Sequence, residues 1–278
     1  MSNVSISTNK LSIGYAGRGR KSKAEGRKIV QRDLSFSLCE GEMVCMLGPN
    51  GCGKSTLLRT LAGLQPPLSG TYNIKSQMTN DRMSNVKSQM SNDKSQMSND
   101  KSISLVLTER LSLENTTVHD VVAMGRYPYT SFLGGLSAED EAIIAKSLQA
   151  VGFSPAPSGE GREVATTFFN AHSDGEKQRI LIAKALAQQT PIILLDEPTA
   201  HLDLPHRILV LRLLRRLAHE QGKTILISTH ELDLALALSD RILLMSPGRG
   251  VQLDTAENLR KTDSFTSAFG MDIFNPLG

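Results

Sequence analysis

Three short apolar runs, each ending in polar residues, constrain the fold more than any other feature of the sequence. They span residues 42–47, 191–195 and 224–227, and they lead into Gly48, Asp196 and Ser228. Continuous apolar runs of this length, with helix-period segments between them, are typical of parallel strands that are buried on both faces. In an open parallel sheet, the functional site lies outside the carboxyl ends of the strands. We therefore predict an α/β fold whose functional residues gather along one sheet edge.

The first run leads into a phosphate-binding pattern. A complete G-x-x-x-x-G-K-S match between a predicted strand and a helical pattern is formed by Gly48, Pro49, Asn50, Gly51, Cys52, Gly53, Lys54, Ser55 and Thr56. Its glycines let backbone N–H groups turn inward as an anion nest, and the helix N-terminus adds a positive end. Lys54 is expected to reach the β- and γ-phosphates, and the Ser55 hydroxyl to coordinate Mg²⁺. The alternative, a Gly-rich turn with a surface lysine, is disfavoured by the two flanking patterns.

The cysteines give a redox prediction. Cys39, Cys45 and Cys52 form no CxxC pair and have no metal-like spacing, which suits a reducing compartment. Cys52 lies beside Lys54 and a helix N-terminus, and both favour a thiolate. We nevertheless favour a small residue that fills the loop over a redox role for Cys52. A thiol alkylator is still expected to block nucleotide binding, and bound ATP to protect the thiol.

The other two runs end in catalytic residue types. Two adjacent carboxylates at a strand end point in different directions, so we expect Asp196 to hold Mg²⁺ and Glu197 to deprotonate the attacking water. His230 follows the third run and is expected to contact the γ-phosphate or the water. The nucleotide is predicted to be ATP rather than GTP, because the one NKxD-like tetrad, residues 9–12, lacks the aspartate.

Bulk composition excludes several classes. A net charge of +3 and a pI near 8.7 are too mild for nucleic-acid binding, and the basic segment 18–28 is expected to be a solvated loop. No segment approaches the ~20 apolar residues of a membrane span, and no signal peptide is expected at the N-terminus. If the protein works at a membrane, another chain must therefore supply the span.

Residues 75–101 differ in composition from the rest of the chain. They contain a seven-residue repeat, KSQMSND and its variants, with one shorter unit inside it. A coiled coil needs two apolar positions per heptad, and each full unit offers only its methionine. We therefore predict a disordered, solvated insertion without a catalytic role.

Four motifs in order, GPNGCGKST, HSDGE, IILLDEPTAHLD and ISTH, resemble the nucleotide-binding subunit of an ATP-binding cassette (ABC) transporter over about residues 11–245. The resemblance implies a single domain, residues 1–278, with a P-loop NTPase (RecA-like) core and an antiparallel β edge. It also implies an inserted helical subdomain at about 110–175. Two copies of such a chain would form a homodimer that encloses two ATP molecules.

The resemblance assigns further site residues. Ser173 and Gly175 belong to the signature, which acts on ATP held by the opposite subunit, and Asp203 closes the loop that meets the partner. Tyr15 takes the place of the aromatic residue that stacks on adenine. Ser173 and Glu176 also form a capping box, so one motif can cap its own helix and bind phosphate. His172 stands where the family has leucine, and Asp174 where it has glycine; we expect Asp174 to point away or to act as a second cap.

A further departure concerns the metal. The family normally has a glutamine near residues 106–110 that contacts Mg²⁺. Either Thr108 or Glu109 takes its place in this chain, depending on how the segment is aligned with the family. We favour Glu109, whose carboxylate can ligate the metal.

Residues 117–129, with LLRTLAGLQPPLSG and LDLPHR, resemble the ATPase subunits of importers for iron-siderophore complexes, haem and cobalamin. The implied partners are transmembrane permease subunits and, indirectly, a periplasmic or surface substrate-binding protein, with the chain peripheral on the cytoplasmic side of the membrane. Arg126, Tyr127 and Tyr129 are the docking candidates, unless they pack within the helical subdomain. A soluble ABC ATPase of DNA repair or translation, and a nucleotide-binding regulatory module, are the alternative functions.

Overall fold

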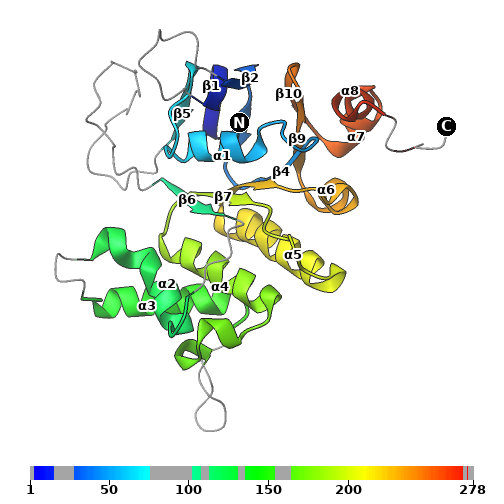
Figure 1. Ribbon diagram of the computed structural model, residues 1–278. Coiled ribbons are helices and arrows are strands. Elements are labelled where there is room, and N and C mark those ends of the chain that lie inside the picture. Colours follow the sequence, from blue (N-terminus) through cyan, green and yellow to red (C-terminus); the bar gives the residue numbers. More distant parts are fainter. Residues whose placement is uncertain are drawn as a thin grey trace.

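The computed structural model describes residues 3–15, 28–75, 102–107, 113–130, 135–153, 164–271 and 274. The predicted insertion, apart from Lys75, lies outside these residues. So do Glu109 and the basic segment apart from Lys28. Two sheets stand above a group of helices, with the C-terminal helices to one side (Figure 1).

A six-stranded sheet forms the centre of the fold, in the order β10-β9-β4-β8-β7-β6. Its strands are β4 (Met43–Leu47), β6 (Ile103–Val106), β7 (Ile192–Asp196), β8 (Thr224–Ser228), β9 (Arg241–Ser246) and β10 (Gly250–Asp254). All neighbours pair in parallel except β10 with β9. Every residue of β4, β7 and β8 is buried, which confirms the prediction from the three apolar runs.

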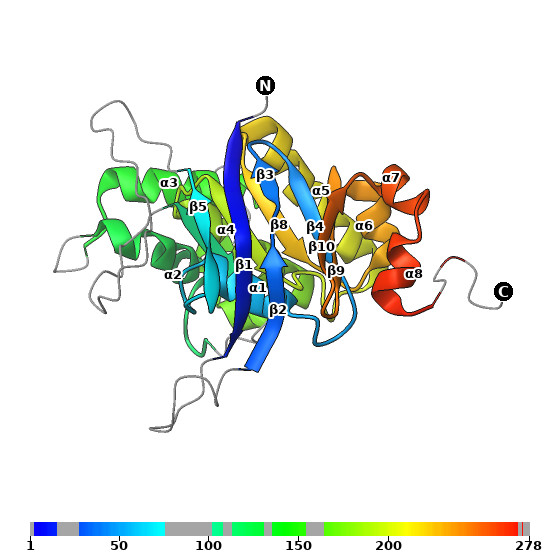
Figure 2. The ribbon, with the colours of Figure 1, turned by 90° about the horizontal axis from the view of Figure 1, so that it is seen from above.

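A second, antiparallel sheet covers one side of this centre. It consists of β1 (Val4–Tyr15), β2 (Lys28–Leu34), β3 (Ser37–Cys39) and β5 (Ser69–Ile74), all three of the others pairing with β1. Seen from above, β1 runs between β2 and β5 (Figure 2). Helix α1 (Lys54–Leu61) lies between the two sheets, and its leucines share one apolar cluster with residues of both. The antiparallel edge and the P-loop NTPase core of the predicted fold are both present.

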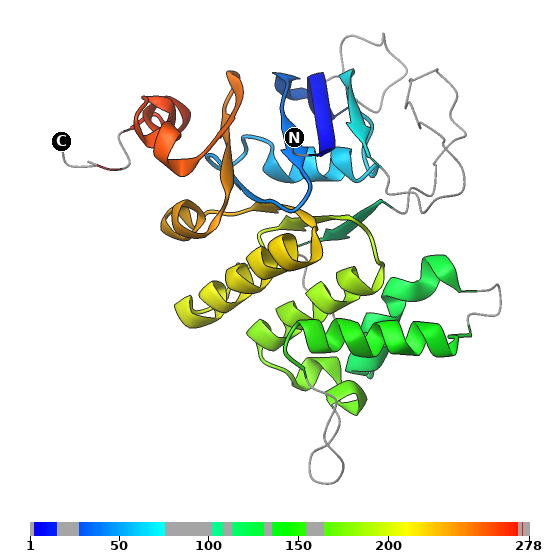
Figure 3. The same cartoon turned by 180° about the vertical axis from the view of Figure 1, so that it is seen from behind.

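A second apolar cluster lies on the opposite face of the six-stranded sheet. The elements that contribute to it are α2 (Val118–Ala123), α3 (Ala138–Ala150), the 3-10 turns η2 (Val164–Thr166) and η3 (Phe169–Ala171), α4 (Asp174–Ala187), α5 (Leu204–Gln221), α6 (Leu232–Leu238), α7 (Ala256–Arg260) and α8 (Ser264–Phe269). The 3-10 turn η1 (Met124–Tyr129) directly follows α2. From behind, α2, α3 and α4 group together beyond the edge strand β6 (Figure 3).

Local sequence signals explain where these helices begin. The side chains of Thr117 and Ser137 each accept a hydrogen bond from the backbone N–H of an aspartate three positions further on. The carboxylate of that aspartate accepts in turn from the backbone N–H of the threonine or serine. Such capping boxes satisfy backbone N–H groups that the first helical turn leaves unpaired. Helix α5 ends at Gly222, which adopts the left-handed conformation that glycine accepts without strain.

Arg126 and Tyr129 pack within the helical subdomain, which was the alternative to a docking role for these two residues. The Arg126 guanidinium is only 5% exposed; its Nε donates to Asp140 at 2.8 Å and its Nη1 to the Ala187 carbonyl at 2.8 Å. Hydrogen bonds from Ser137, and then from Arg126, lower the pKa of Asp140 to about 2. The Tyr129 hydroxyl donates to the Gln188 carbonyl at 2.7 Å. Only Tyr127, at 60% exposure, remains open to a partner.

Candidate nucleotide-binding and catalytic site

The loop between β4 and α1 has a backbone that only glycine suits at two positions. Gly48 has a φ of 155°, and a Cβ there would lie 2.5 Å from the Met245 carbonyl oxygen. Gly53 has a φ of 107°, and a Cβ there would lie 2.7 Å from Val30 Cγ1. The loop is therefore packed against β2 and β9 on its outer side, which keeps its backbone close to whatever lies inside it.

Lys54 places a buried cation inside this loop. Lys54 is 7% exposed. Its Nζ donates to the carbonyl of Gly48 at 2.8 Å and to that of Pro49 at 3.5 Å. Among the described residues, no carboxylate pairs with this ammonium group, so phosphate oxygens are favourable replacements for the two carbonyls. Asn50 and Gly51 are exposed at the tip of the loop.

Tyr15 lies next to the start of α1. Its hydroxyl is 3.2 Å from the Thr56 Oγ1, and the residue is 49% exposed. A half-exposed aromatic ring beside the loop is chemically able to stack on a nucleobase, and the role that the resemblance implies for Tyr15 stays a prediction.

The Cys52 side chain is buried, as in the interpretation that we favoured. The residue is 3% exposed, and its burial raises the pKa of the thiol, while the Lys54 charge and backbone N–H oppose the shift more weakly. The side chain packs against Gly48, where a Cβ would lie 2.9 Å from the Cys52 Sγ. Burial therefore outweighs the influence of the helix N-terminus and of Lys54 on this thiol.

Ser55 and Asp196 meet where the sequence predicts Mg²⁺. The Ser55 hydroxyl donates to Asp196 Oδ1 at 3.1 Å, and Ser228 donates to the same oxygen at 2.6 Å. Asp196 is 7% exposed. A buried carboxylate beside a serine hydroxyl fits Mg²⁺, which takes few protein ligands and completes its shell with phosphate and water. Consistent with this small donor set, no group of three His, Cys, Asp or Glu side chains suited to a metal occurs within the described residues.

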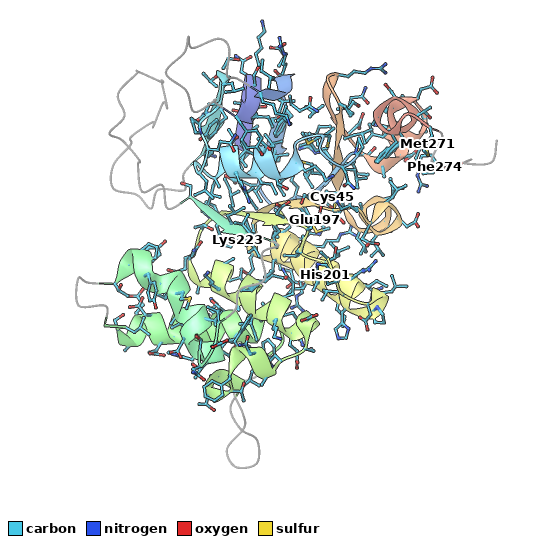
Figure 4. All side chains as sticks on the ribbon, viewed as in Figure 1. Cys45, Glu197, His201, Lys223, Met271 and Phe274 are labelled. Atoms are coloured by element: carbon cyan, nitrogen blue, oxygen red, sulfur yellow. The ribbon has the colours of Figure 1, made fainter. Side chains whose placement is uncertain are left out.

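Glu197 and His230 lie beside this pair. The side chains of Glu197 and His230 are 31% and 45% exposed, and Glu197 Oε1 forms an ion pair with His230 Nε2. Glu197 has a φ of 47°, a left-handed backbone conformation that residues other than glycine adopt rarely. Such conformations are enriched at active sites. Its backbone N–H donates to the Ser228 Oγ at 2.9 Å. Figure 4 labels Glu197 and His201 on the segment between β7 and α5.

Ser228 is a site residue that sequence reasoning missed. It ends β8 opposite Asp196 in the parallel register, so its hydroxyl donates to Asp196 and accepts from the Glu197 backbone. One hydroxyl thus fixes both carboxylate-bearing residues. The signal was its position at the end of an apolar run, but only the register identifies its partner.

The signature segment forms the N-terminus of α4. Ser173 Oγ accepts from the Glu176 backbone N–H, and Glu176 Oε2 accepts from the Ser173 backbone at 3.0 Å, as in the expected capping box. The Asp174 carboxylate is 60% exposed and lies 4.0 Å from the Lys177 ammonium.

Gly175 is buried against the start of α5. A Cβ there would lie 2.6 Å from His206 Cδ2, so the two helix N-termini are in contact. His206 pairs with Asp203, whose carboxylate also accepts the His206 backbone N–H at 3.1 Å and so caps α5. Asp203 and the signature are thereby joined in one small cluster.

The anion nest with an enclosed lysine, and the Ser55–Asp196 pair at the ends of neighbouring elements, define a P-loop nucleoside triphosphatase. Comparison with known families refines this class. The ABC transporter family matches residues 31–200, and the chain belongs to that family as an ATP-binding, ATP-hydrolysing subunit.

Individual relatives agree with the family. The chain is similar to the iron(3+)-hydroxamate import ATP-binding protein FhuC of Bacillus subtilis (strain 168), at 34% identity over 96% of this chain and 88% of that protein. It also resembles a metal-chelate type ABC transporter in an inward-facing conformation, with a TM-score of 0.75 and 28% identity over 96% of this chain and 90% of that one. The dimeric ABC transporter cassette MJ0796 matches with a TM-score of 0.65 and 25% identity, over 90% and 98% of the two chains.

Within the described ranges, no helix is both long and apolar enough to cross a membrane.

Proposed function

We propose that this chain hydrolyses ATP to power the import of a metal chelate, of which iron-siderophore complexes, haem and cobalamin are the candidate classes. The similarity to an iron(3+)-hydroxamate import ATP-binding protein across almost the whole chain carries this proposal. The similarity to a metal-chelate type transporter supports it independently. The whole chain, residues 1–278, serves as one nucleotide-binding domain with a helical subdomain at about 110–175.

ATP binds at the loop between β4 and α1. Backbone N–H groups within residues 48–56, of which Pro49 has none, and the Lys54 ammonium bind the phosphates, and Tyr15 stacks on the adenine. Ser55 and Asp196 hold Mg²⁺, which neutralises charge on the β- and γ-phosphate oxygens. Glu109 is a further candidate ligand, outside the described residues.

Glu197 acts as the general base. Its carboxylate is open to solvent on one side and held by His230 on the other, so it can accept a proton from a water molecule that attacks the γ-phosphate. His230 orients this carboxylate and contacts the γ-phosphate.

The signature acts across a homodimer. Helices α1 and α4 lie on opposite faces of the six-stranded sheet, which supports a role for Ser173 and Gly175 at a nucleotide on a second copy rather than at their own. The Ser173 hydroxyl and the N–H groups at the start of α4 bind the partner's γ-phosphate, and Asp203 contacts the partner. The dimeric assembly of the similar cassette MJ0796 supports this arrangement.

The permease docks on the helical side, at the cytoplasmic face of the membrane. A hollow of about 170 Å³ lies between β6 and α4 and includes Val106, Leu181 and Lys184. Burial lowers the pKa of the Lys184 ammonium, so a carboxylate on a cytoplasmic permease segment is a favourable partner. Tyr127 provides a second, exposed contact on the same subdomain.

Two variants test the catalytic assignment. Lys54→Ala is expected to lose ATP binding, and Glu197→Gln to bind ATP while hydrolysis falls by ~10²- to 10⁴-fold. Phosphate release and nucleotide binding are measured on the full-length chain. Hydrolysis by Lys54→Ala at the parent rate would refute the site.

Co-expression with a permease gene, where one lies beside this gene, tests the transport role. We expect the two proteins to co-purify and Lys184→Glu to weaken the complex. Lys261→Glu, at the exposed end of α7 and away from the helical subdomain (Figure 1), should leave the complex intact. Absence of any membrane partner would favour the soluble ABC ATPase instead.

A further inference from the structure

Gln31 of β2 connects the phosphate-binding loop to its surroundings. The residue is 1% exposed, and its amide nitrogen donates to the Cys52 carbonyl at 3.0 Å and to the Ser246 carbonyl at 2.9 Å. Two carbonyl acceptors require a donor, so the orientation of the amide is fixed. Its Oε1 is buried and has no hydrogen-bond partner among the residues that the structure describes.

This contact determines where a neighbouring N–H group points. In a planar trans peptide, the C=O of one residue and the N–H of the next point in opposite directions. Because Gln31 holds the Cys52 carbonyl toward β2, the Gly53 N–H is directed to the other side of that peptide, which is the inside of the loop. Gly53 has a φ of 107°, a conformation that glycine adopts readily and other residues rarely do. Because glycine is conformationally free, an external contact is needed to fix the orientation of the peptide between Cys52 and Gly53.

β2 is packed closely behind this peptide. A Cβ on Gly53 would lie 2.7 Å from Val30 Cγ1 and 3.5 Å from Gln31 Cγ. The second acceptor, Ser246, ends β9, whose Met245 carbonyl faces Gly48 in the same loop. Gln31 therefore connects β2, the end of β9 and the phosphate-binding loop on the outer side of that loop.

We propose that Gln31 is a positioning residue that orients the Gly53 N–H toward the nucleotide phosphates. The inference rests on the proposed role of the loop in binding ATP. The two donated hydrogen bonds stabilise the fold, because the carbonyls of Cys52 and Ser246 would otherwise lack this donor. The role in phosphate binding is in addition to this structural role, and it depends on the direction that the Cys52 carbonyl imposes on the Gly53 N–H.

The test compares ADP with adenosine, which lacks phosphates, on the full-length Gln31→Leu chain. The dissociation constant for ADP is expected to rise ~3- to 10-fold, as the loss of one oriented hydrogen bond implies, with adenosine changed less than twofold. The Tm is expected to fall modestly, because two hydrogen bonds to carbonyls are lost while one unpartnered oxygen is removed. The selective loss of ADP affinity over adenosine affinity therefore carries the test. An unchanged ADP affinity overturns the proposal, and so does an equal loss for ADP and adenosine.

Controls separate this result from other failures. Gln31→Met repeats the test with an unbranched side chain if the leucine variant does not fold. Gln178→Met removes another glutamine whose buried amide nitrogen has no partner among the described residues, on the opposite face of the sheet, and should leave ADP affinity unchanged. Lys54→Ala is measured alongside: if it loses ADP affinity while Gln31→Leu does not, only the Gln31 inference fails. If Lys54→Ala keeps its affinity, the proposed function itself fails.

Discussion

Glu197 and His230 form an ion pair between the ends of the neighbouring strands β7 and β8. The pair sits next to Asp196, which is buried and hydrogen-bonded to two serines. Two adjacent carboxylates therefore have different environments, with Glu197 open to solvent and Asp196 enclosed. This division suits one metal ligand and one proton acceptor.

His230→Ala is expected to lower kcat for ATP hydrolysis by ~10²-fold, because the Glu197 carboxylate loses the group that orients it. The KM for ATP should rise less than kcat falls, since the variant loses one γ-phosphate contact while the phosphate-binding loop and Lys54 are intact. His230→Gln keeps a donor and should retain part of the activity. Steady-state phosphate release measures both variants, and an unchanged kcat in His230→Ala would show that the pair has no part in hydrolysis.

Ser228→Ala should weaken the metal site. The variant removes one hydrogen bond to Asp196 and the acceptor for the Glu197 backbone N–H. We expect the Mg²⁺ concentration for half-maximal ATPase activity to rise ~5-fold. Ser239→Ala is the matched control, because that hydroxyl donates to the Ala235 carbonyl in α6. Equal Mg²⁺ dependence in both variants would contradict the role assigned to Ser228.

His172 is expected to stabilise the signature through Thr167. The Thr167 hydroxyl donates to the Val164 carbonyl at 2.6 Å, so it accepts from the His172 Nε2 at 2.7 Å. The other ring nitrogen, Nδ1, lies 3.6 Å from the Glu176 carboxylate, which accepts the backbone N–H of Ser173 in the capping box. His172→Leu should weaken ATP-driven dimerisation ~5-fold while ADP affinity of the single chain is retained.

A double-mutant cycle gives the contradicting outcome for His172. Thr167→Val combined with His172→Leu should cost less than the sum of the two single variants, because each of them removes the hydrogen bond between Thr167 and His172. Fully additive effects would argue against the link. His119→Leu is the control, since that histidine pairs with Glu141 on the α2–α3 surface.

The three thiols should react in the order Cys39, Cys52, Cys45. Cys39 is partly exposed, whereas burial raises the pKa of Cys52 and raises that of Cys45 to about 12. A raised pKa leaves less thiolate at a given pH, so Cys45 should stay unmodified by iodoacetamide at pH 8 and Cys52 should react faster as pH increases. Mass spectrometry of the labelled peptides measures the order, and denaturant should abolish it. Labelling of Cys52 ahead of Cys39 in the native chain would restore the activated thiolate.

The sequence by itself determined the features that depend on neighbouring residues. The apolar runs before Gly48, Asp196 and Ser228 became β4, β7 and β8, because continuous apolar character is enough to place a strand inside a sheet. The Ser173–Glu176 capping box formed as predicted, since its contacts span one helical turn.

The tertiary structure alone decided what depends on distant segments. The parallel register set Ser228 against Asp196, and packing of β2 behind the loop brought Gln31 to Cys52. Burial raised the pKa of the Cys52 thiol and enclosed Arg126 among helices. Register and burial arise from contacts between residues far apart in the chain, so no local pattern encodes them.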